Sequence, residues 1–433
     1  MKLPLELWSP LPPLASGIAD YVHEQLETLS REFDLTLVGE VVDDVDAELR
    51  RRYKVIAPLQ SDGATLRVYH VGNSPVHGFI YREARRRPGV VVLHEWNLHE
   101  LVLGFAVTSN NFDDYRRQMR REHGERGAIA AETIAAALGF RHWTSVFPLN
   151  AEILEGALGV VCLSASTAKK AAARIPGTPL LHLPHHALLP ANAANRAEAR
   201  TLLGFGPEER IVLAPGLGTV SKSLDVARAA IGSIHSRIPK AILVTVGGGS
   251  GPGEGAVSDR ERVLGRVDLK TLGDALLAAD VVLALRFPSR GETSGVLMRA
   301  LAAGRAAVVS AGATADEDLK EGVVARVNPG PAETAELAAV LELLLGDGDA
   351  RPRMERLARE EGQTRPVGAL TLKLAEFVRS LAAQRQKLEA RVRARAEEGR
   401  LVRGRIKDEL EAAASSLGLT HLPSNVFERL AGL

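Results

Sequence analysis

The sequence predicts an α/β protein built from two domains, each with a parallel sheet covered by helices. Short apolar runs alternate with helical patterns along most of the chain, which is typical of repeated βαβ units. The 433 residues exceed what one core usually holds, because domains cluster near ~100 to 150 residues. The expected strands are residues 35–38, 90–93, 160–163, 211–213, 242–246, 281–285 and 307–310.

The first helix is expected to begin directly behind Ser16, whose hydroxyl suits an N-cap. Apolar residues from Ile18 to Phe33 recur at helical spacing and predict one continuous helix with a buried face. Further along, residues 108–147 interrupt the α/β rhythm with charged helical material. This insertion is either a solvated helical face or a lid over an acceptor site, since it follows a strand end.

The boundary between the domains is expected from Pro184 to about Glu208, where prolines flank a stretch rich in Ala, Asn and Arg. The predicted domains are therefore residues 1–190 and residues 191–365. Residues 366–433 follow the pattern of one long helix, with apolar residues spaced too irregularly for a coiled coil. This helical extension either packs against the body of the protein or links it to an oligomer or a partner domain.

The composition fits a globular protein without a membrane span. Apolar residues make up 45% of the chain and charged residues 25%, and no segment approaches ~18 uninterrupted apolar residues. The net charge of +1 gives no general attraction to nucleic acid. Cys162 is the single cysteine, which fits a reducing compartment, and residues 1–6 lack the apolar run of a secretory signal. We therefore expect a cytoplasmic protein.

Residues 286–304 are the most informative stretch for function. A short polar loop with a single carboxylate, Glu292, follows an apolar strand, and a helix begins at once behind Thr293–Gly295. The first amides of a helix have no intrahelical acceptor and lie at the positive end of its dipole, so they suit a phosphate or diphosphate. Glu292 could then hold hydroxyl groups of whatever the phosphate carries. The simpler interpretation of Glu292 is an acid stabilised by the helix dipole.

Other motifs at strand ends argue against two classes of site. Residues 216–221 resemble a dinucleotide fingerprint, but Ser221 replaces the third glycine and the next strand does not end in the acid that would hold a ribose. A dehydrogenase is therefore disfavoured. His94, Glu95 and His99 are not expected to bind zinc, because their spacing differs from the i, i+4 histidine pair of zinc proteases.

Taken together, these motifs resemble those of GT-B glycosyltransferases, in particular bacterial members close to the family 4 group. The resemblance covers roughly residues 3–365, and each motif falls at a strand end in the expected order. The motifs are Ser9–Pro13, Ser16–Tyr21, Leu93–Glu95 with Leu98–His99, Leu163–Ser164, Pro184–His186, Lys222 and Gly291–Gly295.

The resemblance implies two Rossmann-like domains facing across a cleft, with the nucleotide mainly on the second domain. By position, Ser294 and Gly295 would supply backbone donors, Lys222 a charge on the diphosphate, and Glu292 a contact to sugar hydroxyls. His94 would contact the sugar or the reacting centre, although a structural histidine at a strand end is the alternative. The implied catalytic residues are His94, Glu292 and Lys222. The implied donor-binding residues are Gly17, Gly216, Gly265, Val267, Arg286, Gly291, Thr293, Ser294, Gly295 and Arg299.

Two departures from the family pattern concern the nucleotide. Arg299 occupies the helix position where the family has a second acid that binds the ribose, and the Arg that often precedes Lys222 is missing. Ribose binding is therefore the least supported part of the resemblance. These departures also leave an alternative in which the protein is a catalytically degenerate GT-B scaffold.

The resemblance implies a glycosyltransferase, of hexosyltransferase type, that moves a sugar from a nucleoside diphosphate sugar to a glycan or lipid-linked acceptor in polysaccharide biosynthesis. It implies retention of the anomeric configuration and no metal or other cofactor. A nucleotide-sugar epimerase on the same fold is the alternative enzyme. The arginines at 82, 85, 86 and 87 allow peripheral contact with the inner face of the membrane, but a solvated surface is the simpler interpretation.

Overall fold

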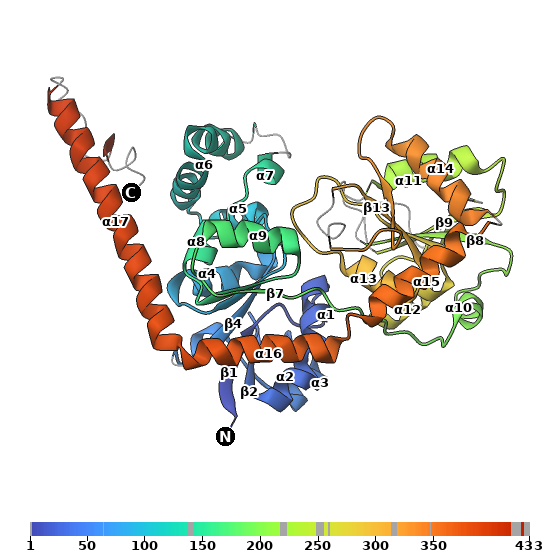
Figure 1. Cartoon of the computed structure of the whole chain (residues 1–433), viewed down its shortest axis with the longest axis horizontal. Helices are drawn as coiled ribbons and strands as arrows, with labels where there is room; N and C mark the ends of the chain where they lie inside the picture. Colours follow the sequence, from blue (N-terminus) through green and yellow to red (C-terminus); the bar gives the residue numbers. More distant parts are fainter. Residues whose placement is uncertain are drawn as a thin grey trace. The chain divides into compact units, whose positions relative to one another are not determined.

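The computed structural model describes residues 2–63, 65–136, 138, 143–216, 223–247, 255–258, 260–312, 318–346, 348–416 and 426–427. The chain folds into two compact units (Figure 1). The first unit comprises Met1–Leu163, Thr167–His182 and Leu372–Leu433, and the second comprises Ser164–Ser166 and Leu183–Thr371. Each unit contains one seven-stranded sheet with helices on its faces, so the predicted α/β class is confirmed.

The sheet of the first unit is parallel, with strand order β3-β2-β1-β4-β5-β6-β7. The chain order reverses between β1 and β4, as in a Rossmann-like fold. The strands are β1 (Leu3–Trp8), β2 (Phe33–Val38), β3 (Lys54–Ile56), β4 (Leu66–Val71), β5 (Val90–Leu93), β6 (Gly159–Cys162) and β7 (Leu180–His182). The helices are α1 (Gly17–His23), α2 (Leu26–Glu32), α3 (Ala47–Arg52), α4 (Gly78–Arg86), α5 (His99–Thr108), α6 (Phe112–Ala135), α7 (Trp143–Val146), α8 (Ala151–Glu155) and α9 (Ala165–Arg174), with 3₁₀ turns η1 (Pro58–Gln60) and η2 (Pro75–His77).

The sheet of the second unit has strand order β10-β11-β9-β8-β12-β13-β14. All described pairings are parallel except that of β10 with β11. The strands are β8 (Arg210–Pro215), β9 (Ala241–Val246), β10 (Gly255–Ser258), β11 (Glu261–Val263), β12 (Val281–Ala284), β13 (Ala306–Ser310) and β14 (Ala325–Val327). The helices are α10 (Arg196–Leu202), α11 (Leu224–Ile234), α12 (Leu269–Ala278), α13 (Gly295–Ala302), α14 (Glu333–Leu345) and α15 (Ala350–Gln363).

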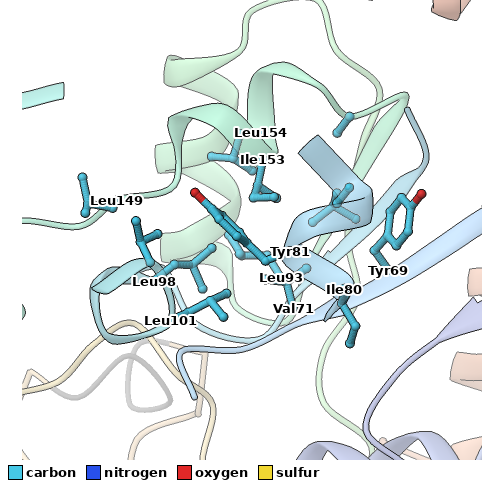
Figure 2. Packing of buried hydrophobic residues seen from close by; sticks show 14 of the residues in the cluster. Tyr69, Val71, Ile80, Tyr81, Leu93, Leu98, Leu101, Leu149, Ile153 and Leu154 are labelled. Atoms are coloured by element: carbon cyan, nitrogen blue, oxygen red, sulfur yellow. The ribbon is translucent and has the colours of Figure 1, made fainter. Parts of the chain in front are cut away.

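Successive side chains along a strand point to opposite faces of the sheet, and both faces are covered by apolar clusters. In β8, Ile211 and Leu213 enter one apolar cluster and Val212 enters the cluster on the opposite face. In the first unit, Figure 2 shows Tyr81 of α4 near the centre of a cluster that includes Leu98. The Tyr81 hydroxyl donates to Gln118 Oε1 of α6 at 2.9 Å, which anchors the helical segment to the core. Each unit therefore has its own core.

The continuous helix expected behind Ser16 is wrong, although the cap is confirmed. Ser16 Oγ accepts from the Ile18 amide at 3.3 Å, but α1 ends at His23, α2 begins at Leu26, and Phe33 opens β2. The amide of the buried Gln25 donates to Val22 O, a tighter i→i−3 bond that breaks the regular ladder. Buried apolar residues nevertheless continue across this break, with Tyr21 and Val22 in α1 and Leu26 and Leu29 in α2.

The single long helix expected at the C-terminus is also two helices, α16 (Val367–Ala383) and α17 (Arg385–Ser416). Leu381 of α16 is buried where Gly159 at the start of β6 lets it approach: a Cβ on Gly159 would lie 2.6 Å from Leu381 Cδ1. In α17, Arg395 donates from Nη1 to Glu155 O at the end of α8, at 3.2 Å. A guanidinium is favoured at a helix C-terminus, where carbonyl groups lack intrahelical donors. Arg395 therefore ties α17 to the rest of the first unit.

Candidate active site

The carboxyl ends of the strands in the second unit gather several of the predicted donor-binding residues. Gly216 follows β8, Gly265 follows β11, and Arg286 follows β12, and these strands lie within the four neighbouring parallel strands β11-β9-β8-β12. Strand order reverses between β8 and β12, and ligands of open α/β sheets bind at the carboxyl ends beside such a switch point. The fold thus places these residues where a ligand is expected.

Backbone hydrogen bonds between neighbouring strand ends hold this edge together. The Gly216 amide donates to Val246 O at 2.7 Å, and the Gly247 amide donates to Gly265 O at 2.7 Å. Gly216 has a φ of 124°, a conformation that L side chains rarely adopt, so the backbone itself requires glycine there. Ser310 Oγ at the end of β13 accepts from the Arg286 amide at 2.9 Å. Ser310 was not among the predicted residues, because serine in an apolar strand carries no distinguishing pattern.

The loop after β12 folds around the Glu292 carboxylate. Glu292 Oε1 lies 2.9 Å from Arg286 Nε, and Glu292 Oε2 accepts from the Arg290 amide at 2.6 Å. Glu292 is 8% exposed, whereas the Arg286 side chain is 31% exposed. The turn is completed by Gly291 with a φ of 80°. A carboxylate offers about four acceptor positions, so these two contacts fix the loop and leave Glu292 with further acceptor capacity.

Helix α13 begins at Gly295, directly behind this loop. Ser294 caps it, with Oγ accepting from the Leu297 amide at 3.3 Å. The amides of Gly295 and Val296 are the first of the helix and have no intrahelical acceptor. His185 lies against the same turn, since a Cβ on Gly295 would lie 3.8 Å from His185 Nε2. His185 Nδ1 donates to His186 O at 2.7 Å, and burial lowers the pKa of His185 to about 3.

Three other predicted residues of the second unit have different surroundings. Arg299 donates from Nη1 to Leu188 O at 3.0 Å, so part of its guanidinium is used in holding the segment before α10. Val267 packs partly buried against the core, and Thr293 is half-buried in the loop before α13. Lys222 lies outside the described residues.

In the first unit, His94 follows β5 at the carboxyl end of the sheet. His94 is 7% exposed, and its Nε2 lies 3.0 Å from His70 Nδ1 of β4. Tyr21 of α1 packs edge-on against His94, with ring centroids 5.1 Å apart and an interplanar angle of 89°. Gly17, the first residue of α1, precedes Tyr21 by one helical turn. His70 and Tyr21 were not predicted as site residues, because only strand pairing and helix packing bring them to His94.

Packing gives no reason for a glycine at position 17, one of the predicted site residues. A Cβ at Gly17 would meet no heavy atom within 4 Å, and its φ is not positive. We expect Gly17→Ala to change the free energy of unfolding by at most about 1 kcal/mol. If Gly17 contacts the substrate, as the resemblance implies, the added methyl group should displace that substrate and reduce sugar transfer roughly 10- to 100-fold. Denaturant unfolding and steady-state kinetics measure the two effects.

Gly368→Ala is the matched control for this change. Gly368 also lies in the first turn of a helix, α16, and a Cβ there meets nothing within 4 Å. Both stability and transfer should remain unchanged in that variant. Equal transfer rates for the Gly17→Ala protein and the wild type would contradict a substrate contact at Gly17.

His99 and the basic surface have structural partners. His99 Nδ1 lies 2.6 Å from Phe147 O and its Nε2 lies 2.7 Å from the Tyr115 hydroxyl. Arg85 binds both carboxylate oxygens of Asp114, which ties α4 to α6. In the part of the chain that the structure describes, there is no group of three or more His, Cys, Asp or Glu side chains that could hold a metal ion. Among the same residues, no helix has the length and apolar character needed to cross a membrane.

The two Rossmann-like units and the long C-terminal helices confirm the predicted GT-B fold class. No protein-family model and no curated protein matches the chain. Solved structures match it over most of its length, at sequence identities that establish the fold alone.

One match is sucrose-phosphate synthase from Thermosynechococcus elongatus, with a TM-score of 0.62 and 16% identity, covering 88% of this chain and 100% of that chain. Another is Anabaena HepE in complex with UDP-glucose, with a TM-score of 0.61 and 14% identity, covering 87% of this chain and 100% of that chain. A third is WaaG, a glycosyltransferase involved in lipopolysaccharide biosynthesis, with a TM-score of 0.53 and 13% identity, covering 86% and 99%. These similar structures are glycosyltransferases of the GT-B fold.

Proposed function

We propose that this protein is a glycosyltransferase, similar to the family 4 group, that transfers a sugar from a nucleoside diphosphate sugar to a glycan or lipid-linked acceptor. One observation carries the proposal: the Glu292 loop and the first amides of α13 lie together beside the switch point of the second sheet. Amides at a helix N-terminus favour a diphosphate, and a neighbouring carboxylate favours sugar hydroxyl groups. The UDP-glucose complex of HepE, a protein of the same fold, supports this choice of ligand.

Each residue has a proposed role in this reaction. The amides of Gly295 and Val296 bind the diphosphate, and Lys222 and Arg286 balance its charge as it leaves. Glu292 accepts hydrogen bonds from the sugar, and His94 contacts the sugar or the reacting centre. The leaving phosphate can accept the proton of the acceptor hydroxyl, so the reaction needs no separate base. We propose retention of the anomeric configuration and catalysis without a metal.

The nucleotide is the part of the substrate with the fewest assigned contacts. The turns at Gly216 and Gly265 present backbone groups at the same edge of the sheet and are proposed to contact the base and ribose. Arg299 replaces the acid expected to bind the ribose, and its bond to Leu188 O leaves that role unassigned. A role in polysaccharide biosynthesis and a cytoplasmic location, at the inner face of the membrane, belong to the same proposal.

A thermal-shift screen against uridine, guanosine and thymidine diphosphate sugars tests the proposed function. Ligand at 100 times its dissociation constant stabilises a protein by about 2.7 kcal/mol, so one donor class should raise the melting temperature clearly. Donor hydrolysis is then followed by NMR, which also reports the anomer of the released sugar. Hydrolysis that persists in excess chelator supports metal-independent chemistry.

The other outcomes of this screen identify the alternatives. Conversion of the donor into its epimer supports a nucleotide-sugar epimerase, which would need an acid–base pair near the sugar in addition to Glu292. Absence of binding and turnover with every donor contradicts the proposal and leaves the catalytically degenerate scaffold.

A further inference from the structure

Two buried histidines meet at the carboxyl end of the first sheet. His70 lies in β4, paired in register with Val92 of β5, and His94 follows that strand. The contact between His70 Nδ1 and His94 Nε2 is 3.0 Å, and the ring centroids are 5.3 Å apart. A hydrogen bond between two imidazoles contains one hydrogen, so one ring donates and the other accepts. Which ring donates determines what the second nitrogen of His94 can do.

The surroundings of His70 decide this question. His70 is fully buried, and burial lowers its pKa to about 3, so the ring is neutral near pH 7. A neutral ring has one N–H and one lone pair. His70 Nε2 is buried and has no hydrogen-bond partner among the described residues. A hydrogen on that atom would be a buried N–H without an acceptor, which is rarer and more costly than a buried lone pair without a donor.

The hydrogen of His70 therefore belongs on Nδ1, from which it is donated to His94 Nε2. Because His94 Nε2 is then an acceptor, neutral His94 carries its own hydrogen on Nδ1. Tyr21 packs edge-on against the His94 ring and restricts the ring flip that would move Nε2 away from His70.

We propose that His70 is a positioning residue that fixes His94 as the Nδ1–H tautomer, so that His94 acts as a hydrogen-bond donor and not as a base. The chemical consequence rests on the proposed function: an Nδ1–H donates to an oxygen of the bound sugar or of its leaving group. It cannot take the proton of the acceptor. That proton then passes to the leaving phosphate, as the proposed mechanism requires.

Nitrogen NMR of the full-length protein labelled with ¹⁵N-histidine tests the tautomer directly. Two-bond and three-bond ¹H–¹⁵N correlations distinguish a protonated Nδ1 from a protonated Nε2, and a His94→Gln spectrum assigns the His94 signals. We expect wild-type His94 to carry its hydrogen on Nδ1. Observation of an Nε2–H on His94 in the wild type overturns the proposal without any variant of His70.

Variants of His70 test whether this residue is the cause. His70→Phe removes the donor, so His94 should shift to the other tautomer or to a mixture. His70→Asn retains an N–H near the position of Nδ1 and should restore the wild-type signals. His77→Phe is the matched control, because His77 is equally buried and makes its Nδ1 contact with Ser74 O, not with His94. A folded His70→Phe protein with an unchanged His94 tautomer overturns the positioning role.

Kinetics provide a second measurement, and the two proposals can fail separately. Loss of one hydrogen bond corresponds to about a tenfold change in rate. We expect kcat to fall by about that factor in His70→Phe with KM little changed, and to recover in His70→Asn. The NMR experiment uses no substrate. A wild-type protein with the Nδ1–H tautomer that binds no nucleotide sugar therefore refutes the proposed function and retains the inference about His70.

Discussion

Glu292→Gln is expected to reduce kcat/KM for sugar transfer by about 10- to 150-fold, because hydrogen bonds to a charged group contribute about 1.5 to 3 kcal/mol. Glutamine has nearly the same shape and can still accept from the Arg290 amide, so the loop should keep its fold. The change removes the negative charge 2.9 Å from Arg286 Nε, and with it the charge-assisted contacts that we propose between Glu292 and sugar hydroxyls. Steady-state kinetics with the donor identified by thermal shift measures the loss, and the melting temperature without ligand monitors the fold.

Glu261→Gln separates a functional effect from the general effect of breaking a Glu–Arg pair. Glu261 is a similarly buried carboxylate, with a 10% exposed side chain, and lies 2.9 Å from Arg228 Nη2. It opens β11, at the amino end of the strand and thus at the edge opposite the proposed donor site. Glu261→Gln should alter stability alone. Equal loss of transfer in both variants would show that Glu292 acts through stability and would contradict a sugar contact.

Asp280→Ala is expected to destabilise the protein by about 3 to 5 kcal/mol, because removing one partner leaves a buried charge without compensation. Asp280 is 3% exposed on its side chain and precedes β12. Its Oδ2 accepts from Arg200 Nη2 and from the Ile211 amide, each at 2.8 Å, and so joins α10 to the two central strands β8 and β12. Urea unfolding followed by circular dichroism measures the loss, with the second unit expected to unfold first.

Asp225→Ala is the control for this stability effect. Asp225 also pairs with an arginine, Arg228, but its side chain is fully exposed and the contact is 3.5 Å long. Exposed pairs contribute about 0 to 1 kcal/mol, so the midpoint of unfolding should hardly move. A similarly small change for Asp280→Ala would mean that the Arg200 guanidinium finds other partners in the folded state.

The local geometry of the candidate site could be predicted where one short segment contains all its groups. The Glu292 loop is such a segment: strand, glycine turn, carboxylate and helix N-terminus follow one another within residues 281–295, so spacing alone places the carboxylate beside free amides. His94 was predicted for the same reason, since it directly follows an apolar strand. The partners of both residues were not predicted. His70 and Ser310 are distant in sequence from the groups they contact, and no local pattern distinguishes them.

The sequence by itself determined the class of fold. All seven expected strands are present, because a strand buried on both faces needs a short apolar run whatever its neighbours are. It also determined the Ser16 cap, which depends on a side chain and an amide two residues apart. The break between α1 and α2 was not predicted, since an interruption of two residues leaves the apolar pattern nearly unchanged.

Only the tertiary structure decided the strand order, and with it which loops lie together. The order places the ends of β8 and β12 side by side although about 70 residues separate them, and it pairs β4 with β5 so that His70 reaches His94. Strand pairing depends on packing among distant segments, and the tautomer of His94 depends on whether one buried nitrogen of His70 has a partner. No local stretch of the chain determines either the strand pairing or this tautomer.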